Sequence, residues 1–185
     1  MGFHLVPGSV AKGGWQAFGA DYGRCASKQQ TIFGYKLHLL ITLDGIILDF
    51  VLAPASAADL VVGEQLLDDH TDLEVLGDKG YCSARVQARL WAANRLRLYT
   101  IPRRNQAGQL PAAAVHVHNQ VRQRIETVNS QLAGQFQLQR NYAHSFSGLR
   151  ARLYSKLTAH TLCIYLNKRL GKVAFLQIKA LAFPG

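Results

Sequence analysis

The spacing of hydrophobic and polar residues changes several times along the chain, and the first clear pattern predicts a β-hairpin. Residues 31–42 are rich in β-branched and aromatic side chains, and residues 46–53 repeat this composition. Asp44-Gly45 lies between the two runs and is typical of a tight turn. Pro54 ends the second run, because proline cannot continue a central strand.

Helices and strands are predicted to alternate after the hairpin. Asp59 is the expected N-cap of a helix that reaches about residue 70, and residues 73–76 form a short buried strand. Ser83 is the expected cap of a second helix, and residues 96–101 form another strand. This order indicates an α/β fold in which part of the sheet is parallel.

Two long helices are predicted in the second half. Apolar residues recur every three or four positions between Val117 and Phe136, and again between Leu149 and Ile164. Gly171 is the predicted stop of the last helix. Glycines dominate the beginning of the chain, so we expect three parts: a loop-rich segment at 1–30, the domain at 31–171, and a tail at 172–185.

Charge divides the chain into two unequal parts. Residues 1–78 carry four basic and ten acidic side chains, whereas residues 79–185 carry seventeen basic side chains and one acid, Glu126. Such a cationic surface suggests a polyanion as partner, since Lys and Arg displace counterions from phosphates. A carboxylate within that surface would repel phosphate unless a cation lay between them, which points to Mg²⁺ chemistry.

Simpler explanations exist for the two acids that this argument uses. Glu126 could form a surface ion pair with Arg122, one helical turn earlier, worth only about 0.3–0.5 kcal/mol. Asp78, between Gly77 and Lys79, could be a turn residue. It also lies just past a predicted strand, where ligand sites form in α/β sheets.

Composition excludes several classes of protein. No apolar run reaches the ~18–20 residues of a membrane span, and the N-terminus lacks the pattern of a signal peptide. Cys25, Cys82 and Cys163 are odd in number and far apart, which fits a reducing cytoplasm rather than a disulfide framework or a zinc site. No membrane partner is expected.

Several short motifs follow one another in a distinctive order and spacing: Gly34-Tyr35-Lys36-Leu37-His38, Asp44-Gly45, Leu52-Ala53-Pro54-Ala55, Gly77-Asp78-Lys79-Gly80-Tyr81, Arg124-Ile125-Glu126-Thr127-Val128, Gln131-Leu132, and Leu157 to Cys163. Together they resemble the catalytic domain of bacterial insertion-sequence DDE transposases. The resemblance covers residues 20–184. It implies a ribonuclease-H-like fold with an antiparallel hairpin, parallel strands and flanking helices.

The resemblance also implies a site and its partners. Asp78 matches the second Asp and Glu126 the Glu of an acidic triad that binds Mg²⁺, or Mn²⁺ in its place, for DNA strand cleavage and transfer. DNA is the expected partner, with homo-oligomers or association with a full-length transposase. The residues expected to contact DNA are Lys79, Arg103, Arg104, Arg122, Arg124, Arg150 and Arg152.

The chain departs from this family pattern in four respects. Asn119 and Ala133 stand where the related transposases have Tyr and Lys around the Glu. The first Asp should lie on a strand before residue 34, yet Phe3 to Pro7 contains no acid, and Asp21 is the one carboxylate before Asp44. The N-terminal DNA-binding region of the family has no counterpart either, so the chain is expected to be a C-terminal part of a transposase.

Three functions are compatible with these observations. The first is a DDE transposase domain, inactive or impaired without its first Asp unless Asp21 replaces it. The second is a non-catalytic basic fragment that binds DNA, and the third is a nuclease with the same fold. A basic helix face can also be merely solvated, so charge alone does not separate these alternatives.

Overall fold

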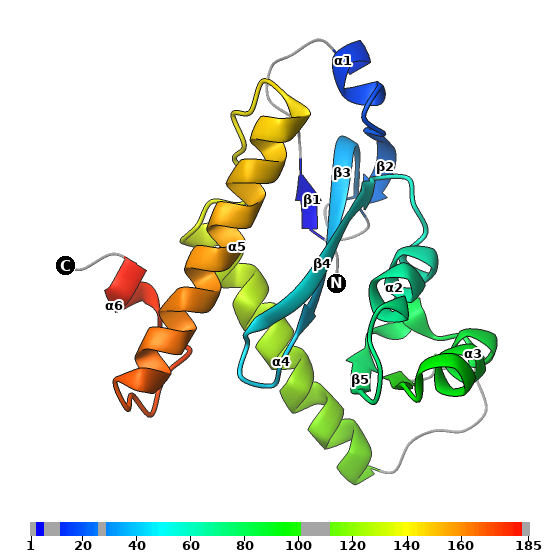
Figure 1. Cartoon of the computed structure of the whole chain (residues 1–185), viewed down its shortest axis with the longest axis vertical. Helices are drawn as coiled ribbons and strands as arrows, with labels where there is room; N and C mark the ends of the chain where they lie inside the picture. The colour runs from blue at the N-terminus through cyan, green and yellow to red at the C-terminus, as the bar shows by residue number, and fades with distance from the viewer. Residues whose placement is uncertain (1–2, 6–11, 26–28, 101–111, 183–185) are drawn as a thin grey trace.

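A computed structural model describes residues 3–5, 12–25, 29–100 and 112–182 (Figure 1). In chain order the elements are β1 (Phe3–Leu5), α1 (Lys12–Gln16), β2 (Asp21–Cys25), β3 (Gln30–Ile41), β4 (Ile47–Pro54), α2 (Asp59–Asp68), β5 (Glu74–Gly77), the 3-10 turn η1 (Lys79–Tyr81), α3 (Ala84–Asn94), β6 (Arg97–Thr100), α4 (Ala112–Gly134), α5 (Phe146–Arg169) and α6 (Lys179–Ala182). The fold is mixed α/β, as the sequence predicts.

Strand β3 is the centre of an antiparallel sheet. Its second half pairs with β1 on one edge and with β4 on the other, and its first half pairs with β2. The predicted hairpin of β3 and β4 is confirmed. Gly45 takes a φ of +80° at its turn, and a Cβ there would lie 2.8 Å from Leu176. Both the backbone conformation and the limited space therefore favour glycine.

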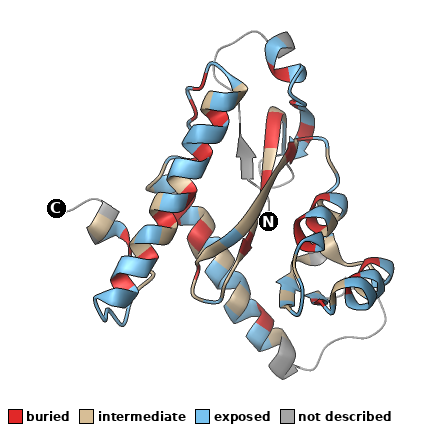
Figure 2. Cartoon of the chain, in the orientation of Figure 1, coloured by how far each residue is buried: buried red, intermediate tan, exposed pale blue. Residues whose placement is uncertain are grey.

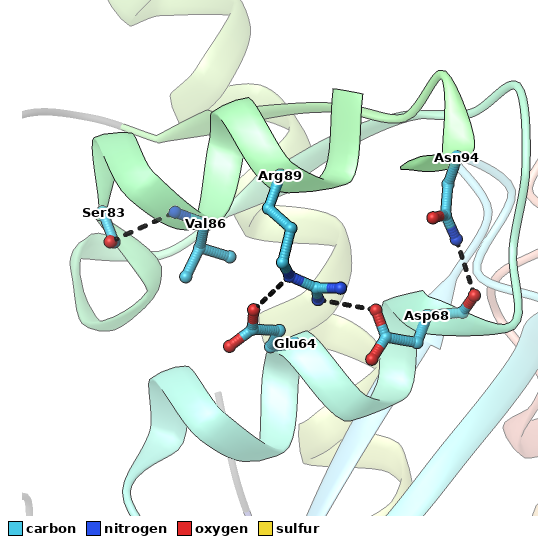
Figure 3. Close-up of polar contacts among 6 residues, drawn as sticks. All are labelled: Glu64, Asp68, Ser83, Val86, Arg89 and Asn94. Atoms are coloured by element: carbon cyan, nitrogen blue, oxygen red, sulfur yellow. Dashed lines mark hydrogen bonds and ion pairs between the residues drawn. The ribbon is translucent and has the colours of Figure 1, made fainter. Parts of the chain in front are cut away.

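The two strands after the hairpin pair in parallel and form a second small sheet. Helix α3 connects β5 to β6, as the alternation of elements predicts. Ser83 is the N-cap of α3, and its side chain accepts a hydrogen bond from the Val86 amide. Arg89 of α3 pairs with Glu64 and Asp68, which fixes α3 against α2 (Figure 3).

The alternating side chains of β3 divide the interior into two cores, and buried residues lie on the helices to either side of the sheet (Figure 2). Tyr35 and Leu37 pack against α4 and α5, whereas Leu40 faces α2, α3 and β6. The first core contains Leu132 and Leu153, both buried. Strand β3 therefore lies between a layer that holds α4 and α5 and a layer that holds α2 and α3.

Three details differ from the sequence-based expectation. Residues 1–30 were expected to be loop, but β1, α1 and β2 form there because β3 supplies an edge with which short strands can pair.

The tail after Gly171 packs onto the domain: Ile178 is fully buried, and Gln131 donates to the Leu176 carbonyl. Asp59 is the first helical residue and not the N-cap, which is Ala58, because its carboxylate binds Lys36 instead.

None of the helices within the described part of the chain is long and apolar enough to cross a membrane.

Candidate functional site

The end of strand β5 positions Asp78. The strand stops at Gly77, and the chain turns at once into η1, where the Tyr81 amide donates to the Asp78 carbonyl over 2.9 Å. His118 of α4 is buried, and its Nε2 lies 3.1 Å from the Gly77 carbonyl oxygen. This contact holds α4 against the same strand end.

Glu126 lies about two turns further along α4 than His118. Its side chain is roughly half exposed, and Oε1 lies 2.9 Å from Nε of Arg122. The ion pair considered from the sequence is therefore present. An exposed pair of this kind stabilises a helix by only about 0.3–0.5 kcal/mol, so a cation or phosphate could separate its two members.

Asp78 and Glu126 line the same cavity, which has a volume of about 340 Å³. The cavity lies between β3, β5, α2 and α4. Arg122 and Arg124 also line it, so acidic and basic residues predicted from the sequence line one cavity. That these residues act in catalysis or bind a metal stays a prediction.

A partly buried polar network adjoins the turn that follows Asp78. The Tyr81 hydroxyl lies 2.8 Å from Nδ1 of His38, and Nε2 of His38 lies 3.9 Å from the Asp59 carboxylate. Asp59 in turn accepts a hydrogen bond of 2.7 Å from Lys36. Residues 34–38 and residues 77–81, two motifs that are far apart in the sequence, are thus in contact through the side chains of His38 and Tyr81.

The ionisation of Tyr81 fits its place in this network. Burial first, and then the negative charges of Asp59 and Asp78, raise the pKa of its phenol well above the ordinary value. The hydroxyl therefore keeps its proton and can donate it to His38. Sequence analysis used these residues only as family motifs; the signal that it missed is a Lys and a His on one face of an otherwise apolar strand, at positions 36 and 38.

The cavity contains oxygen ligands of the kind that a divalent cation binds. Mg²⁺ and Mn²⁺ prefer oxygen ligands, which Asp78 and Glu126 can supply. Glu74 also lines the cavity, but it lies at the opposite end of β5 and pairs with Arg97 over 3.6 Å. Within the described ranges no group of three or more His, Cys, Asp or Glu side chains could hold a metal ion.

Asp21 does not join this site. It pairs with Gly34 of β3, whereas the cavity begins at Leu39, about 17 Å further along the strand. Hydrogen bonds from the Ser56 side chain and then the Tyr22 amide lower the pKa of Asp21. The expectation that Asp21 could replace the missing acid finds no support in this position.

The expected DNA contacts are distributed over several parts of the chain. Arg122 and Arg124 lie at the cavity, and Arg150 and Arg152 are exposed on α5 outside its lining. Arg103 and Arg104 fall outside the described residues, as does the side chain of Lys79. Of the departures from the family pattern, Asn119 is exposed on α4. Ala133 packs against the first core, a position that would bury the first carbons of a lysine.

Comparison with known families gave one finding. The model of the transposase DDE domain family matches residues 6–162 of the chain. Neither the curated proteins nor the solved structures gave a match.

Proposed function

The chain belongs to the transposase DDE domain family, and we propose that it is the catalytic domain of a bacterial insertion-sequence transposase. Membership of this family implies a role in DNA transposition, binding to DNA and, usually, the use of a divalent metal. In this proposal the substrate is a DNA phosphodiester, and the reaction is strand cleavage followed by strand transfer.

The observation that carries this proposal is the common cavity of Asp78 and Glu126. Asp78 follows a strand end and Glu126 projects from a helix, and both share this cavity with Arg122 and Arg124, whose charge attracts phosphate. Asp78 and Glu126 would hold Mg²⁺ or Mn²⁺. The metal ion would activate the attacking oxygen and stabilise the leaving one.

Arg122 has two roles in this arrangement. In the unbound chain its guanidinium neutralises Glu126. When Glu126 turns to a cation, Arg122 is released, and its planar donors can bind a phosphate oxygen of the DNA. Arg124, on the same cavity, provides a second positive charge for that phosphate.

We propose further that the chain is catalytically impaired by itself. Two-metal chemistry needs carboxylates that hold both ions around the scissile phosphate, and Asp78 and Glu126 are two. Asp21 is too far from the cavity to be the third. A segment that brings a further Asp to this cavity should restore cleavage.

The second candidate function is a non-catalytic DNA-binding protein that competes with an intact transposase or associates with it. The charge of residues 79–185 favours it, as does the ion pair that occupies Glu126. This candidate needs the same DNA affinity but no metal.

Nicking of supercoiled DNA in Mg²⁺ or Mn²⁺ separates the two candidates. We expect the chain to bind DNA without nicking it, and a chain extended at its N-terminus by an Asp-containing strand to nick it. That gain should disappear in Asp78→Asn and Glu126→Gln. If the extended chain binds DNA and never nicks it, the non-catalytic function is correct. If the unextended chain nicks and Asp21→Ala abolishes the reaction, Asp21 is the third acid.

A further inference from the structure

A row of polar side chains lies on the side of helix α4 that lines the cavity. His118, Arg122 and Glu126 recur once per helical turn, so they are neighbours on one face of the helix. Arg122 and Glu126 are each about half exposed, and they pair with one another over 2.9 Å. His118 is different, because only 6% of its surface is exposed. It therefore contacts other parts of the protein rather than solvent.

His118 contacts the strand end that precedes Asp78. Its Nε2 lies 3.1 Å from the carbonyl oxygen of Gly77, the last residue of β5. A carbonyl can only accept, so Nε2 carries the proton and donates it. The Gly77 carbonyl belongs to the planar peptide unit that ends at the Cα of Asp78. A hydrogen bond to this oxygen therefore helps to fix where Asp78 begins.

Helix α4 connects this contact rigidly to Glu126. The acid lies about 12 Å beyond His118, at a rise of about 1.5 Å per residue, and the helix continues without interruption to Gly134. Beyond Glu126, the buried Gln131 donates to the Leu176 carbonyl and holds the helix against the tail. Polar contacts thus anchor α4 on both sides of Glu126.

Apolar side chains of α4 and β5 line the same cavity. They include Val121 and Ile125 of the helix and Leu76 of the strand. Apolar contacts have no preferred direction, so they favour a close approach of helix and strand without selecting one register. The hydrogen bond of His118 is directional. It can therefore fix the helix and the strand end, and with them the two acids, relative to each other.

Packing alone does not explain a histidine at this position. Nδ1 of His118 is buried and has no hydrogen-bond partner among the described residues. A buried polar atom without a partner lowers stability, so an apolar side chain would suit a position that only fills space. The hydrogen bond at Nε2 is what histidine provides here and leucine does not.

We propose that His118 is a positioning residue: its hydrogen bond to the Gly77 carbonyl keeps Asp78 and Glu126 in the relative position in which they share one divalent cation. This inference rests on the proposed function, since it takes the two acids as cation ligands. His118 is not itself a ligand, because Nε2 is bound to Gly77 and Nδ1 is buried. Loss of a partner outside the ligands typically costs roughly 10–100-fold in metal affinity.

The test compares the Mn²⁺ affinity of variants by electron paramagnetic resonance of the free ion. His118→Leu removes the donor and should weaken binding roughly tenfold or more. His118→Gln should retain affinity close to that of the parent, since its amide nitrogen is as many bonds from Cα as Nε2 is. His118→Asn, whose shorter side chain does not reach Gly77, should repeat the loss with a polar residue.

Gln131→Leu is the matched control on the same helix. It removes a buried hydrogen bond at the other anchor of α4, so it should lower Tm without weakening Mn²⁺ binding. Asp78→Asn should abolish binding and so identify the site at which Mn²⁺ is measured.

A second measurement needs no metal. The Tyr81 amide donates to the Asp78 carbonyl, so its hydrogen exchange reports how firmly the turn is held. Exchange of this amide should be at least tenfold faster in His118→Leu than in the parent. It should return towards the parent rate in His118→Gln and stay at that rate in Gln131→Leu.

Three results would overturn the proposal. They are parent-like Mn²⁺ affinity in His118→Leu, an equal loss of affinity in Gln131→Leu, and unchanged exchange of the Tyr81 amide in His118→Leu. A parent chain without Mn²⁺ binding that depends on Asp78 contradicts the proposed function instead. Faster Tyr81 exchange in His118→Leu would then still show that His118 positions Asp78, and unchanged exchange would refute this as well.

Discussion

Single side chains determine how firmly the turn after β5 is held. Asp78 lies three residues before Tyr81, whose hydroxyl contacts His38 of β3. His38 is almost completely buried, so a lost hydrogen bond at Nδ1 leaves a polar atom without water. The position of Asp78 thus depends on a residue outside the predicted site.

Tyr81→Phe removes only that hydroxyl. We expect a loss of about 1–3 kcal/mol in the free energy of unfolding, because His38 keeps its place but loses the hydrogen-bond partner of its Nδ1. Tyr99→Phe is the matched control, since the Tyr99 hydroxyl makes only a long, exposed contact of 3.5 Å to Glu74. Urea unfolding of both variants checks this expectation; equal losses would contradict it.

His160 makes stability depend on pH. It is fully buried in α5, with Nε2 2.9 Å from Oε1 of Gln131, and burial lowers its pKa from 6.5 to about 4. The unfolded chain therefore binds a proton more readily than the folded chain does. The free energy of unfolding therefore keeps its full value above pH 6.5 and decreases as the pH falls from 6.5 towards 4.

Between pH 7 and pH 5 we expect His160 to cost about 2 kcal/mol of unfolding free energy. His160→Phe should remove that part of the pH dependence, whereas His144→Ala, at an exposed position, should retain it. Urea unfolding at the two pH values measures the difference. An unchanged pH dependence in His160→Phe would assign the acid sensitivity to other groups.

Packing between elements explains why α2 contains a glycine. Gly63 is buried, and a Cβ at this position would lie 2.4 Å from the Tyr81 ring. Helix propensity favours alanine over glycine. The close contact of α2 with η1 favours glycine, and its effect on stability is larger than that of helix propensity. The tertiary contact, and not the helix, selects the residue.

Gly63→Ala should therefore destabilise the domain by about 1–3 kcal/mol, although it improves the helix. Gly134→Ala is the matched control at the end of α4, where a Cβ would meet no atom within 4 Å. That change should be neutral or stabilise by up to ~1 kcal/mol. Thermal unfolding distinguishes the two; a neutral Gly63→Ala would show that Tyr81 can move aside.

The acidic and basic parts of the chain differ in how far their charged side chains form ion pairs. Among the described residues, five of the ten acids of the first part pair with Lys or Arg, such as Asp59 with Lys36 and Asp44 with Lys168. On α5, the described residues give no ion pair to Arg150 or Arg152. These two charges are therefore available to a phosphate backbone.

DNA affinity should fall steeply with salt and depend little on sequence. Replacing Arg150 and Arg152 together by Ala should reduce the slope of log K against log[salt] by up to ~2, one phosphate contact each. Arg89→Ala should leave the slope unchanged, because Glu64 and Asp68 already neutralise Arg89 (Figure 3). Fluorescence anisotropy at several salt concentrations measures this. Equal slopes for all three proteins would remove α5 from the DNA surface.

The sequence by itself determined the helices and strands from β3 to α5, and it directed attention to Asp78 and Glu126. Alternation along β3, the turn at Asp44-Gly45 and the three-to-four spacing in α5 depend on neighbouring residues, so local pattern was sufficient. The placement of Asp78 after a strand followed in the same way.

Only the tertiary structure decided which elements meet. It placed Glu126 on the cavity of Asp78, located Asp21 far from both, and joined Tyr81 to His38. It also formed strands within residues 1–30 where the composition predicts loop, because hydrogen bonds to β3 outweigh weak local propensity. Contacts between residues distant in sequence depend on how whole layers pack, and the local sequence pattern does not determine that packing.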